Sequence, residues 1–237
     1  MNNESPHNNY RLSIRFTPGG FSLSVYDKVI NSLISTKKQS LDLLNLNENQ
    51  LLDALESQSE FKQTFSDLRL IIESECYSTI PEAFYTNENA ENILKFQYPE
   101  LSTSQSILKN DLIAWNATIV FAVHKPLESV LKSMFPEIPI EHHLFALIND
   151  EIPLSGKSAI YVFLRTEKLD LILLEEGQLS LVNSFRFDTN EDVLYHIMNV
   201  YENKMLSKET CELTIFNPNK ELEHLLLTYI HNIKFRN

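Results

Sequence analysis

Cysteine is scarce in this sequence, and the two residues present, Cys76 and Cys211, lie far apart. Neither belongs to a C-x-x-C pair or to a zinc-ligand spacing, which favours a reducing compartment over a disulfide framework. Long apolar runs are missing as well, since none approaches the roughly 20 residues that span a bilayer. The first nine residues, MNNESPHNN, lack the basic and apolar regions of a secretory signal. We therefore expect a cytoplasmic protein with no direct insertion into a membrane.

Positive charge is also in short supply. The chain has 20 Lys and Arg against 32 Asp and Glu, a net charge of −12. Such a balance repels phosphates, which argues against a nucleic-acid partner or an anionic membrane surface but still allows a local basic pocket. The hydrophobic fraction of 43% and the charged fraction of 22% are those of a globular protein, and 237 residues suffice for one large core or two modest ones.

Glycine occurs only four times, and one of the four stands in PLSGKSAIYVFL (153–164), whose Gly-Lys-Ser is the end of a P-loop motif. A P-loop needs a second glycine five residues earlier, where this chain has Glu151, and a helix after the lysine. The residues that follow, AIYVFL, are β-branched and aromatic and predict a strand. The stretch therefore predicts a polar turn ahead of a strand, which excludes this kind of nucleotide site.

A repeat is present instead. RLSIRFTPGGFSLSVYD (11–27) and IYVFLRTEKLDLILLEEG (160–177) share one apolar pattern at a constant offset of 148 residues. Apolar residues recur with a period of two in both stretches and are interrupted by a polar turn in the middle. That pattern predicts two hairpins, each with one buried face.

The order of elements after the two hairpins is also shared. A third strand is predicted at 29–35 and at 179–187, and a helix at 47–57 and at 189–205. The second of these helices opens on Thr189 and Asp192, the spacing of a capping box. Two amphipathic hairpins can align by chance, but the common order strand–strand–strand–helix makes a duplication the better explanation.

The remaining segments fit the same plan. The continuous apolar run Ile119 to Val123 predicts a strand covered on both faces, and Pro126 predicts the first turn of a helix. Residues 86–110 are the least decided segment and are predicted to form loops and a helix at the edge of the first half. Further elements are predicted as strands at 68–74, 116–124 and 211–216 and as helices at 140–150 and 220–233.

This order resembles the actin-like ATPase fold, a ribonuclease H-like α/β architecture with a duplicated β-β-β-α-β-α unit. Within it, the segment NATIVFAVHKPLESVLKSMFPEIPIEHHLFALIND, just ahead of the second hairpin, is similar to the bacterial pilus-assembly and cell-division members. The chain also resembles an uncharacterised bacterial family known as a domain of unknown function. The resemblance implies two similar halves around a cleft, divided here into 10–140 and 141–237, with 141–150 as a connecting helix.

The phosphate-binding motifs of active members are absent. A carboxylate that organises Mg²⁺ and a glycine that admits the phosphate backbone are expected at each hairpin turn, in a D-x-G motif. The corresponding residues here are Arg15-Phe16-Thr17 and Phe163-Leu164-Arg165, and the adenosine loop reads Asn217-Pro218-Asn219. The departure predicts no catalytic residues, no metal and no bound cofactor.

A second hypothesis is an anion site that binds without a metal. Arg15, Thr17, Gly19 and Gly20 in the first hairpin, with Arg165 in the second, would face the cleft of this fold, and guanidinium groups bind phosphate or carboxylate without a metal. The alternative is that both arginines pair with local carboxylates. The adjacent His142 and His143 would point about 100° apart on a helix, which favours structural roles over metal binding.

These observations support one leading hypothesis and two rivals. The leading hypothesis is a catalytically degenerate actin-like protein that acts as a scaffold or interaction module for another protein. One rival is a divergent nucleotide-binding ATPase or kinase with a rearranged site around Arg15, Thr17, Gly19 and Gly20. The other is a small-anion sensor whose halves close on the ligand.

Overall fold

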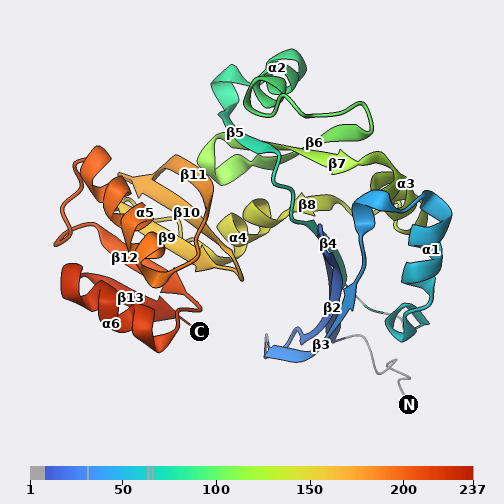
Figure 1. The fold of residues 1–237 in the computed structure, drawn as a ribbon, viewed down its shortest axis with the longest axis horizontal. Helices are drawn as coiled ribbons and strands as arrows, with labels where there is room; N and C mark the ends of the chain where they lie inside the picture. Colours follow the sequence, from blue (N-terminus) through green and yellow to red (C-terminus); the bar gives the residue numbers. More distant parts are fainter. Residues whose placement is uncertain (1–8, 31, 63–64, 66, 237) are drawn as a thin grey trace. The chain divides into compact units, whose positions relative to one another are not determined.

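The structure, a computed structural model, describes residues 9–30, 32–62, 65 and 67–236, and these form two compact units. The first unit extends to Asp150 and the second begins at Glu151, so the division lies ten residues beyond the predicted one at 140. Strand pairing explains the difference, because the short strand at Ile140–His142 joins the sheet of the first unit. Within each unit the chain is built around a five-stranded sheet (Figure 1).

The first unit contains eight strands and four α-helices among its described residues. They are β1 (Tyr10–Thr17), β2 (Gly20–Asp27), β3 (Ser32–Ser40), α1 (Glu48–Glu56), β4 (Asp67–Ile72), β5 (Tyr77–Pro81), α2 (Asn87–Gln97), β6 (Gln105–Leu112), β7 (Ala117–His124), α3 (Lys125–Met134), β8 (Ile140–His142) and α4 (His143–Glu151). A short 3₁₀ turn, η1 (Leu43–Asn45), follows β3 and matters for the site described below.

The second unit is smaller. Its elements are β9 (Ala159–Leu164), β10 (Lys168–Glu175), β11 (Gln178–Arg186), α5 (Asn190–Asn203), β12 (Glu212–Phe216), α6 (Lys220–Tyr229) and β13 (Ile233–Arg236). The Gly156-Lys157-Ser158 stretch lies in the turn ahead of β9, which confirms that it precedes a strand and opens no helix.

The two large sheets have one topology. Their strand orders are β3-β2-β1-β4-β8 and β11-β10-β9-β12-β13. In both, the first two neighbouring pairs are antiparallel and the last two are parallel. This correspondence confirms the duplicated architecture predicted from the sequence.

A pair of β-bulges repeats as well. The register between β2 and β3 shifts at Val25/Tyr26, and that between β10 and β11 shifts at Leu173/Leu174, again 148 residues further on. A bulge adds one unpaired residue and bends the strand, so it is a specific feature rather than a general property of hairpins. Its recurrence at equivalent positions supports a true internal repeat.

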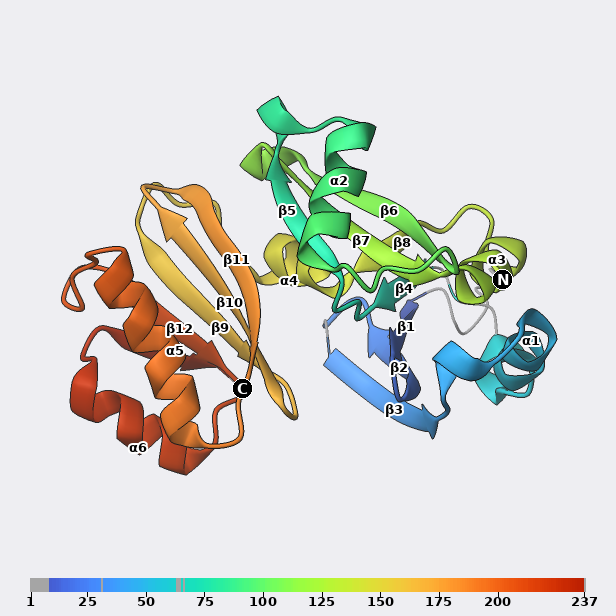
Figure 2. The ribbon, with the colours of Figure 1, turned by 45° about the horizontal axis from the view of Figure 1, so that its top comes forward.

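The three-stranded sheet β5-β7-β6 is an addition to the first unit. Helix α2 lies across one of its faces (Figure 2), where Ala90 and Leu94 pack on Ile80 and Val120. Phe121, on the neighbouring position of β7, contacts the ring of His142 with centroids 5.0 Å apart. The central strand β7 is therefore covered on both faces, as its continuous apolar run predicts.

His142 and His143 lie at the junction of β8 and α4 and not, as predicted, together inside one helix. Both are buried, at 0% and 1% exposure, and their rings are 4.4 Å apart. His142 Nε2 is 3.0 Å from the backbone oxygen of Ser74, which ties β8 to the segment after β4. Within the described ranges, no three His, Cys, Asp or Glu side chains are grouped so that they could hold a metal ion.

Arg69 of β4 fixes α4 to the first unit. Its Nε lies 3.0 Å from Glu141 in β8, and its Nη1 lies 2.6 Å from Asp150 near the end of α4. The guanidinium side chain is 18% exposed, so these pairs are only partly screened by water. This cluster is a second reason why the chain divides after Asp150 and not after 140.

The core of the second unit lies between its sheet and the helices α5 and α6, which run side by side in Figure 2. The capping box predicted at Thr189 and Asp192 is present at the start of α5. Tyr201 and Cys211 are buried in this core, and the Tyr201 hydroxyl donates to the backbone oxygen of Cys211 at 3.0 Å. Burial raises the pKa of the Cys211 thiol to about 11, with a smaller contribution from Glu175, so the thiol is neutral near pH 8.

Candidate functional site

The charged residue next to the first hairpin turn, Arg15, forms an ion pair within the chain. The guanidinium Nη1 of Arg15 donates to the Oε1 of Glu73, just after β4, at 3.0 Å. The two side chains are 34% and 15% exposed, so the positive charge of Arg15 is largely offset by a neighbouring carboxylate. The alternative stated for Arg15, pairing with a local carboxylate, is what the structure shows.

The rest of that turn is also occupied by contacts within the chain. The Thr17 hydroxyl donates to the backbone oxygen of Gly20 at 3.3 Å, and the Leu41 amide donates to the oxygen of Gly19 at 3.1 Å. Gly20 has a φ of +137°, and a Cβ at this position would lie 2.0 Å from the backbone oxygen of Gln39. The close approach of β3 therefore accounts for Gly20, whereas Gly19 has open space around it.

Arg165, in the hairpin turn of the second unit, is held in the same way. Its Nε and Nη2 donate to the two carboxylate oxygens of Asp170 at 2.8 and 2.7 Å. Asp170 is fully buried and also accepts from the Ser184 hydroxyl at 2.6 Å. Each arginine thus forms an ion pair inside its own unit, and a shared anion site that includes both stays a prediction.

A magnesium–triphosphate fits these residues poorly. The turn Thr17–Gly20 contains no carboxylate to organise the metal, and Arg15 stands where one would be needed. The nearby carboxylate of Glu73 is engaged by the Arg15 guanidinium, and Gly20 admits a neighbouring strand. No chemical step through a metal or a nucleotide follows from this geometry.

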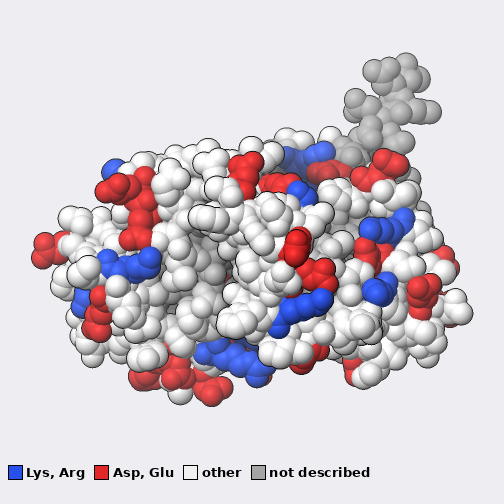
Figure 3. Space-filling view, turned by 90° about the horizontal axis from the view of Figure 1, so that it is seen from above, with Lys and Arg blue, Asp and Glu red and all other residues white. Residues whose placement is uncertain are grey.

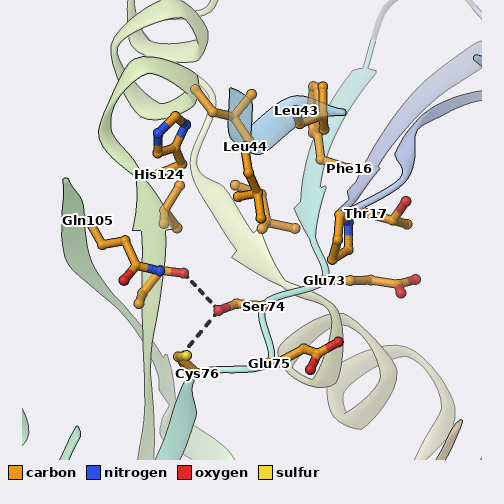
Figure 4. A pocket seen from close by; sticks show the side chains of 15 residues that line it. Phe16, Thr17, Leu43, Leu44, Glu73, Ser74, Glu75, Cys76, Gln105 and His124 are labelled. Carbon is orange, nitrogen blue, oxygen red and sulfur yellow. Dashed lines mark hydrogen bonds between the residues drawn. The ribbon is translucent and has the colours of Figure 1, made fainter. Parts of the chain in front are cut away.

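A pocket of about 350 Å³ lies at the ends of β1 and β4 in the first unit (Figure 4). Five segments distant in the sequence build it: the end of β1 with the β1–β2 turn, η1, the end of β4 with the link to β5, the start of β6, and the end of β7 with the start of α3. The lining residues are Phe16, Thr17, Pro18, Leu43, Leu44, Ile72, Glu73, Ser74, Glu75, Cys76, Gln105, Ala122, Val123, His124 and Leu127.

The pocket wall is mainly apolar. Most of its apolar side chains are buried core residues whose edges reach the cavity, as Leu43 does at 3% exposure. Leu44 differs, because it is 56% exposed and projects toward the middle of the pocket in Figure 4. A large leucine left half in water beside a cavity is a feature of binding surfaces more than of a closed core.

Acidic groups mark one side of this pocket. Glu73 and Glu75 lie on one side in Figure 4, with His124 and Gln105 on the opposite side. Between them, the Ser74 hydroxyl bonds to the backbone oxygens of Ala122 at 2.7 Å and Cys76 at 3.2 Å, which ties β7 to the link after β4.

The Cys76 thiol is held in its neutral form. Its pKa is raised by burial first and then by the negative charges of Glu100 and Glu75. Because the thiolate is the nucleophilic form, this environment argues against a catalytic cysteine.

His124 lines the other wall. Its Nδ1 is a buried side-chain nitrogen, and the structure gives it no hydrogen-bond partner. This nitrogen is enclosed by protein atoms, so it offers no contact to a ligand in the pocket.

This pocket was not predictable from the sequence. Its residues carry no motif, and their proximity depends on the three-stranded sheet, two strands of which were not predicted. A partial signal was present in Leu43 and Leu44, two large apolar residues outside any predicted strand or helix. A second partial signal was the pair of acidic residues Glu73 and Glu75 at the end of a predicted strand.

A family model decides the classification. The family described as "Protein of unknown function (DUF3822)" matches residues 2–233. The chain belongs to the DUF3822 family. No curated protein matches the sequence, so the family assignment brings no activity with it.

Similarity to solved structures identifies the fold of this DUF3822 protein. A Bacteroides thetaiotaomicron protein described as having an actin-like ATPase fold and unknown function superposes with a TM-score of 0.79, at 23% identity over 100% of this chain and 94% of that one. The DUF3822 chain therefore has the actin-like ATPase fold, as the sequence predicted. More distant likenesses are the PilM–PilN type IV pilus biogenesis complex (TM-score 0.49, 11% identity, 98% and 89% covered) and the cytoplasmic domain of Vibrio cholerae EpsL (0.47, 8%, 88% and 82%).

Two surface properties of the DUF3822 chain complete the description. On the face in Figure 3, the charged side chains of the described residues are interspersed in sign rather than gathered into one basic area. None of the helices in the described ranges combines the length and apolar character that crossing a bilayer requires.

Proposed function

We propose that this chain is an interaction module that binds a segment of another protein in the pocket of its first unit, without turning over a nucleotide. One observation carries the proposal: the pocket combines a half-exposed apolar wall at Leu44 with carboxylates at Glu73 and Glu75. An apolar wall that continues outside the cavity suits a peptide segment, whose side chain can fill the cavity while its main chain covers the exposed part of the wall. The carboxylates oppose a phosphate-bearing ligand.

The nucleotide and anion-sensor hypotheses gain less support from the same residues. Both require a free positive charge near the first hairpin turn, and the charge of Arg15 is offset by Glu73 at 3.0 Å. Both also use Gly19 and Gly20 as a phosphate-approaching pair, yet the space beside Gly20 is filled by the Gln39 backbone. The proposed module has no cofactor, does not bind nucleic acid and does not insert into a membrane. Its proposed location is the cytoplasm.

The proposal predicts that Leu44→Ser abolishes partner binding. The substitution removes the half-exposed apolar wall, and an exposed leucine contributes little to folding, so stability should change by less than about 1 kcal/mol. The measurement is crosslinking and affinity capture of the tagged chain from its native cells. The matched control is Leu154→Ser, because Leu154 is also an exposed leucine outside any α-helix or strand, at 70%.

We expect the wild-type chain and the Leu154→Ser variant to capture the same protein, and Leu44→Ser to lose at least nine-tenths of it. Undiminished capture by the Leu44→Ser variant would show that the pocket is not the docking site. Unfolding of each variant in urea checks that a lost interaction does not reflect a lost fold.

A further inference from the structure

Strand β3 forms an open edge of the first five-stranded sheet (Figure 2). It pairs with β2 along one side, and no other strand in the described ranges pairs with it. The opposite edge of that sheet is closed, because the Asn110 side chain donates to the backbone oxygen of Ile140 at 3.0 Å and accepts from the His142 amide at 2.7 Å. No described side chain caps β3 in this way, so its outer N–H and C=O groups are open to an added strand.

The side chains of this edge are also exposed. Every residue from Leu33 to Ser40 is exposed, including the two large apolar ones, Leu33 at 53% and Ile34 at 52%. In the turn just ahead of the strand, Val29 and Ile30 are 73% and 71% exposed. Four large apolar side chains thus lie in water within a short stretch of chain, and a continuous patch of this kind marks a binding surface.

The second unit supplies an internal comparison. Its strand β11 occupies the equivalent edge of the duplicated sheet. Leu181 and Phe185 of β11 are partly buried against the core of that unit, and over the whole described length of β11 none of the large apolar side chains is exposed. An edge strand of this architecture therefore does not need exposed leucine or isoleucine, and their exposure is specific to β3.

The charge of β3 is opposite to that of the chain. The net charge of the protein is −12, whereas β3 contains Lys37 and Lys38 and neither Asp nor Glu. The Nζ of Lys37 lies 3.6 Å from Glu60, with the lysine side chain 48% exposed. Lys38 is exposed and forms no ion pair with a residue that the structure describes. A ligand strand with carboxylates would therefore be attracted to this edge.

The same lysines decide between a second copy of this chain and another protein. Two β3 strands paired with each other would bring four lysines and no carboxylate to one junction, and lysine on an edge strand disfavours such pairing. Protection against self-pairing does not explain the exposed Leu33 and Ile34, however, because these apolar side chains oppose it. An acidic strand with apolar residues accounts for both features.

The regular part of β3 is long enough to receive a strand. The register between β2 and β3 shifts next to Val25, which leaves Ile34 as the extra residue of the bulge. Beyond it, Ser35–Ser40 pair regularly with Gly20–Val25. Six residues are a typical strand length, and the two lysines lie within them.

We infer that β3 binds an extended acidic segment of another protein, which adds antiparallel to its outer edge with carboxylates beside Lys37 and Lys38 and β-branched residues beside Leu33 and Ile34. The antiparallel direction continues the order of β1, β2 and β3. None of the β3 residues lines the pocket described above, so the inference does not depend on the proposed function.

Fluorescently labelled peptides test the inference on the full chain. In acetyl-Thr-Glu-Glu-Thr-Val-Val-Thr-amide, antiparallel addition places the two glutamates opposite Lys38 and Lys37 and the valines near Leu33. Replacing both glutamates with lysine should weaken binding about tenfold at low salt, and replacing both valines with serine should weaken it about fivefold, as measured by fluorescence anisotropy. Equal affinities of the three peptides, or no binding of any up to millimolar concentration, would overturn the inference.

N-methylation tests the main-chain hydrogen bonds. Successive N–H groups of an extended strand point to opposite sides, so only alternate amides of the peptide face β3. Of two peptides methylated at odd and at even positions, one should lose binding about tenfold and the other should keep it within about threefold. Equal effects in the two peptides would contradict strand addition.

Variants of the chain locate the binding. Lys38→Gln should reduce the preference for the acidic peptide severalfold, and Lys157→Gln, at an exposed lysine ahead of β9, should leave it unchanged. Leu33→Ser should weaken the acidic peptide about fivefold, whereas Leu154→Ser should not. Neither lysine substitution removes an ion pair within the described residues, so a lost preference in Lys38→Gln does not reflect a lost fold.

Two further results would assign the edge or the peptide differently. Leu44→Ser should leave peptide binding unchanged, and a loss in this variant would place the peptide in the pocket instead of on β3. In sedimentation equilibrium, a dimer of the wild-type chain that Leu33→Ser dissociates would assign the edge to a second copy and overturn the inference. We expect no association that depends on Leu33.

Discussion

Replacing Gly20 with alanine should destabilise the first unit by more than about 3 kcal/mol. The backbone at Gly20 has a φ of +137°, a conformation that costs a residue with a side chain roughly 1–3 kcal/mol. The new Cβ would also lie 2.0 Å from the oxygen of Gln39, a backbone atom that cannot move aside without shifting β3. Urea unfolding followed by Trp115, a buried tryptophan of the first unit, measures the change.

The adjacent Gly19 provides the control. A Cβ there has no heavy atom within 4 Å, so Gly19→Ala should change the free energy of unfolding by less than about 1 kcal/mol. A loss of similar size at both positions would mean that the turn is not built as described. If Gly19→Ala kept its stability but altered a nucleotide-dependent signal, the phosphate-loop hypothesis would be favoured.

Asp170→Asn should be the most damaging conservative substitution in the second unit. The carboxylate is fully buried, accepts two hydrogen bonds from Arg165 and one from Ser184, and carries the charge that balances the guanidinium. Removing one partner of a buried ion pair costs about 3–5 kcal/mol. We expect the lower end, about 3 kcal/mol, because the Arg165 side chain is 22% exposed and can be partly rehydrated.

Cys211 gives a probe for that measurement, since it is 2% exposed in the core of the same unit. Cys76 is first replaced by serine, so that Cys211 is the one remaining thiol. The rate at which a thiol reagent modifies Cys211, measured at increasing urea concentration, then reports the opening of the second unit. Asp188→Asn, at an exposed aspartate ahead of α5, should leave the rate within twofold. An unchanged midpoint in Asp170→Asn would show that the buried pair contributes nothing to stability.

Much of the fold was predictable because period-two apolar patterns report directly on half-buried strands. The hairpins β1–β2 and β9–β10 were recognised in this way, and their common offset revealed the duplication. Strand β3 begins at Ser32 and not at residue 29, because its residues are exposed and its pattern is weak. For the same reason β6 was missed within 86–110, since it mixes apolar with polar residues.

The predicted helix at 220–233 ends at Tyr229, and Ile233–Arg236 forms an edge strand instead. Four residues beside β12 are too few for a periodicity to appear in the sequence. Strand β5 has five residues and was overlooked on the same ground.

The candidate site could not be predicted from the sequence, for a different reason. The residues Arg15 and Glu73 are 58 positions apart, and nothing in their neighbours indicates that they pair. Leu44, Glu75 and His124 come from three segments that meet only because the added sheet β5-β7-β6 folds onto the end of β4. Spacing along the chain could raise the possibility of an anion site at Arg15, but it could not show which acid would neutralise it.

The central claim, that this actin-like chain binds protein and not nucleotide, is tested most directly by its thermal stability with ATP and Mg²⁺. The account predicts no stabilisation up to millimolar nucleotide, with or without the metal, and no release of phosphate. A ligand present at 100 times its Kd stabilises a folded protein by about 2.7 kcal/mol, which such a measurement resolves easily. Stabilisation of that size that requires Mg²⁺, together with turnover, would contradict the account.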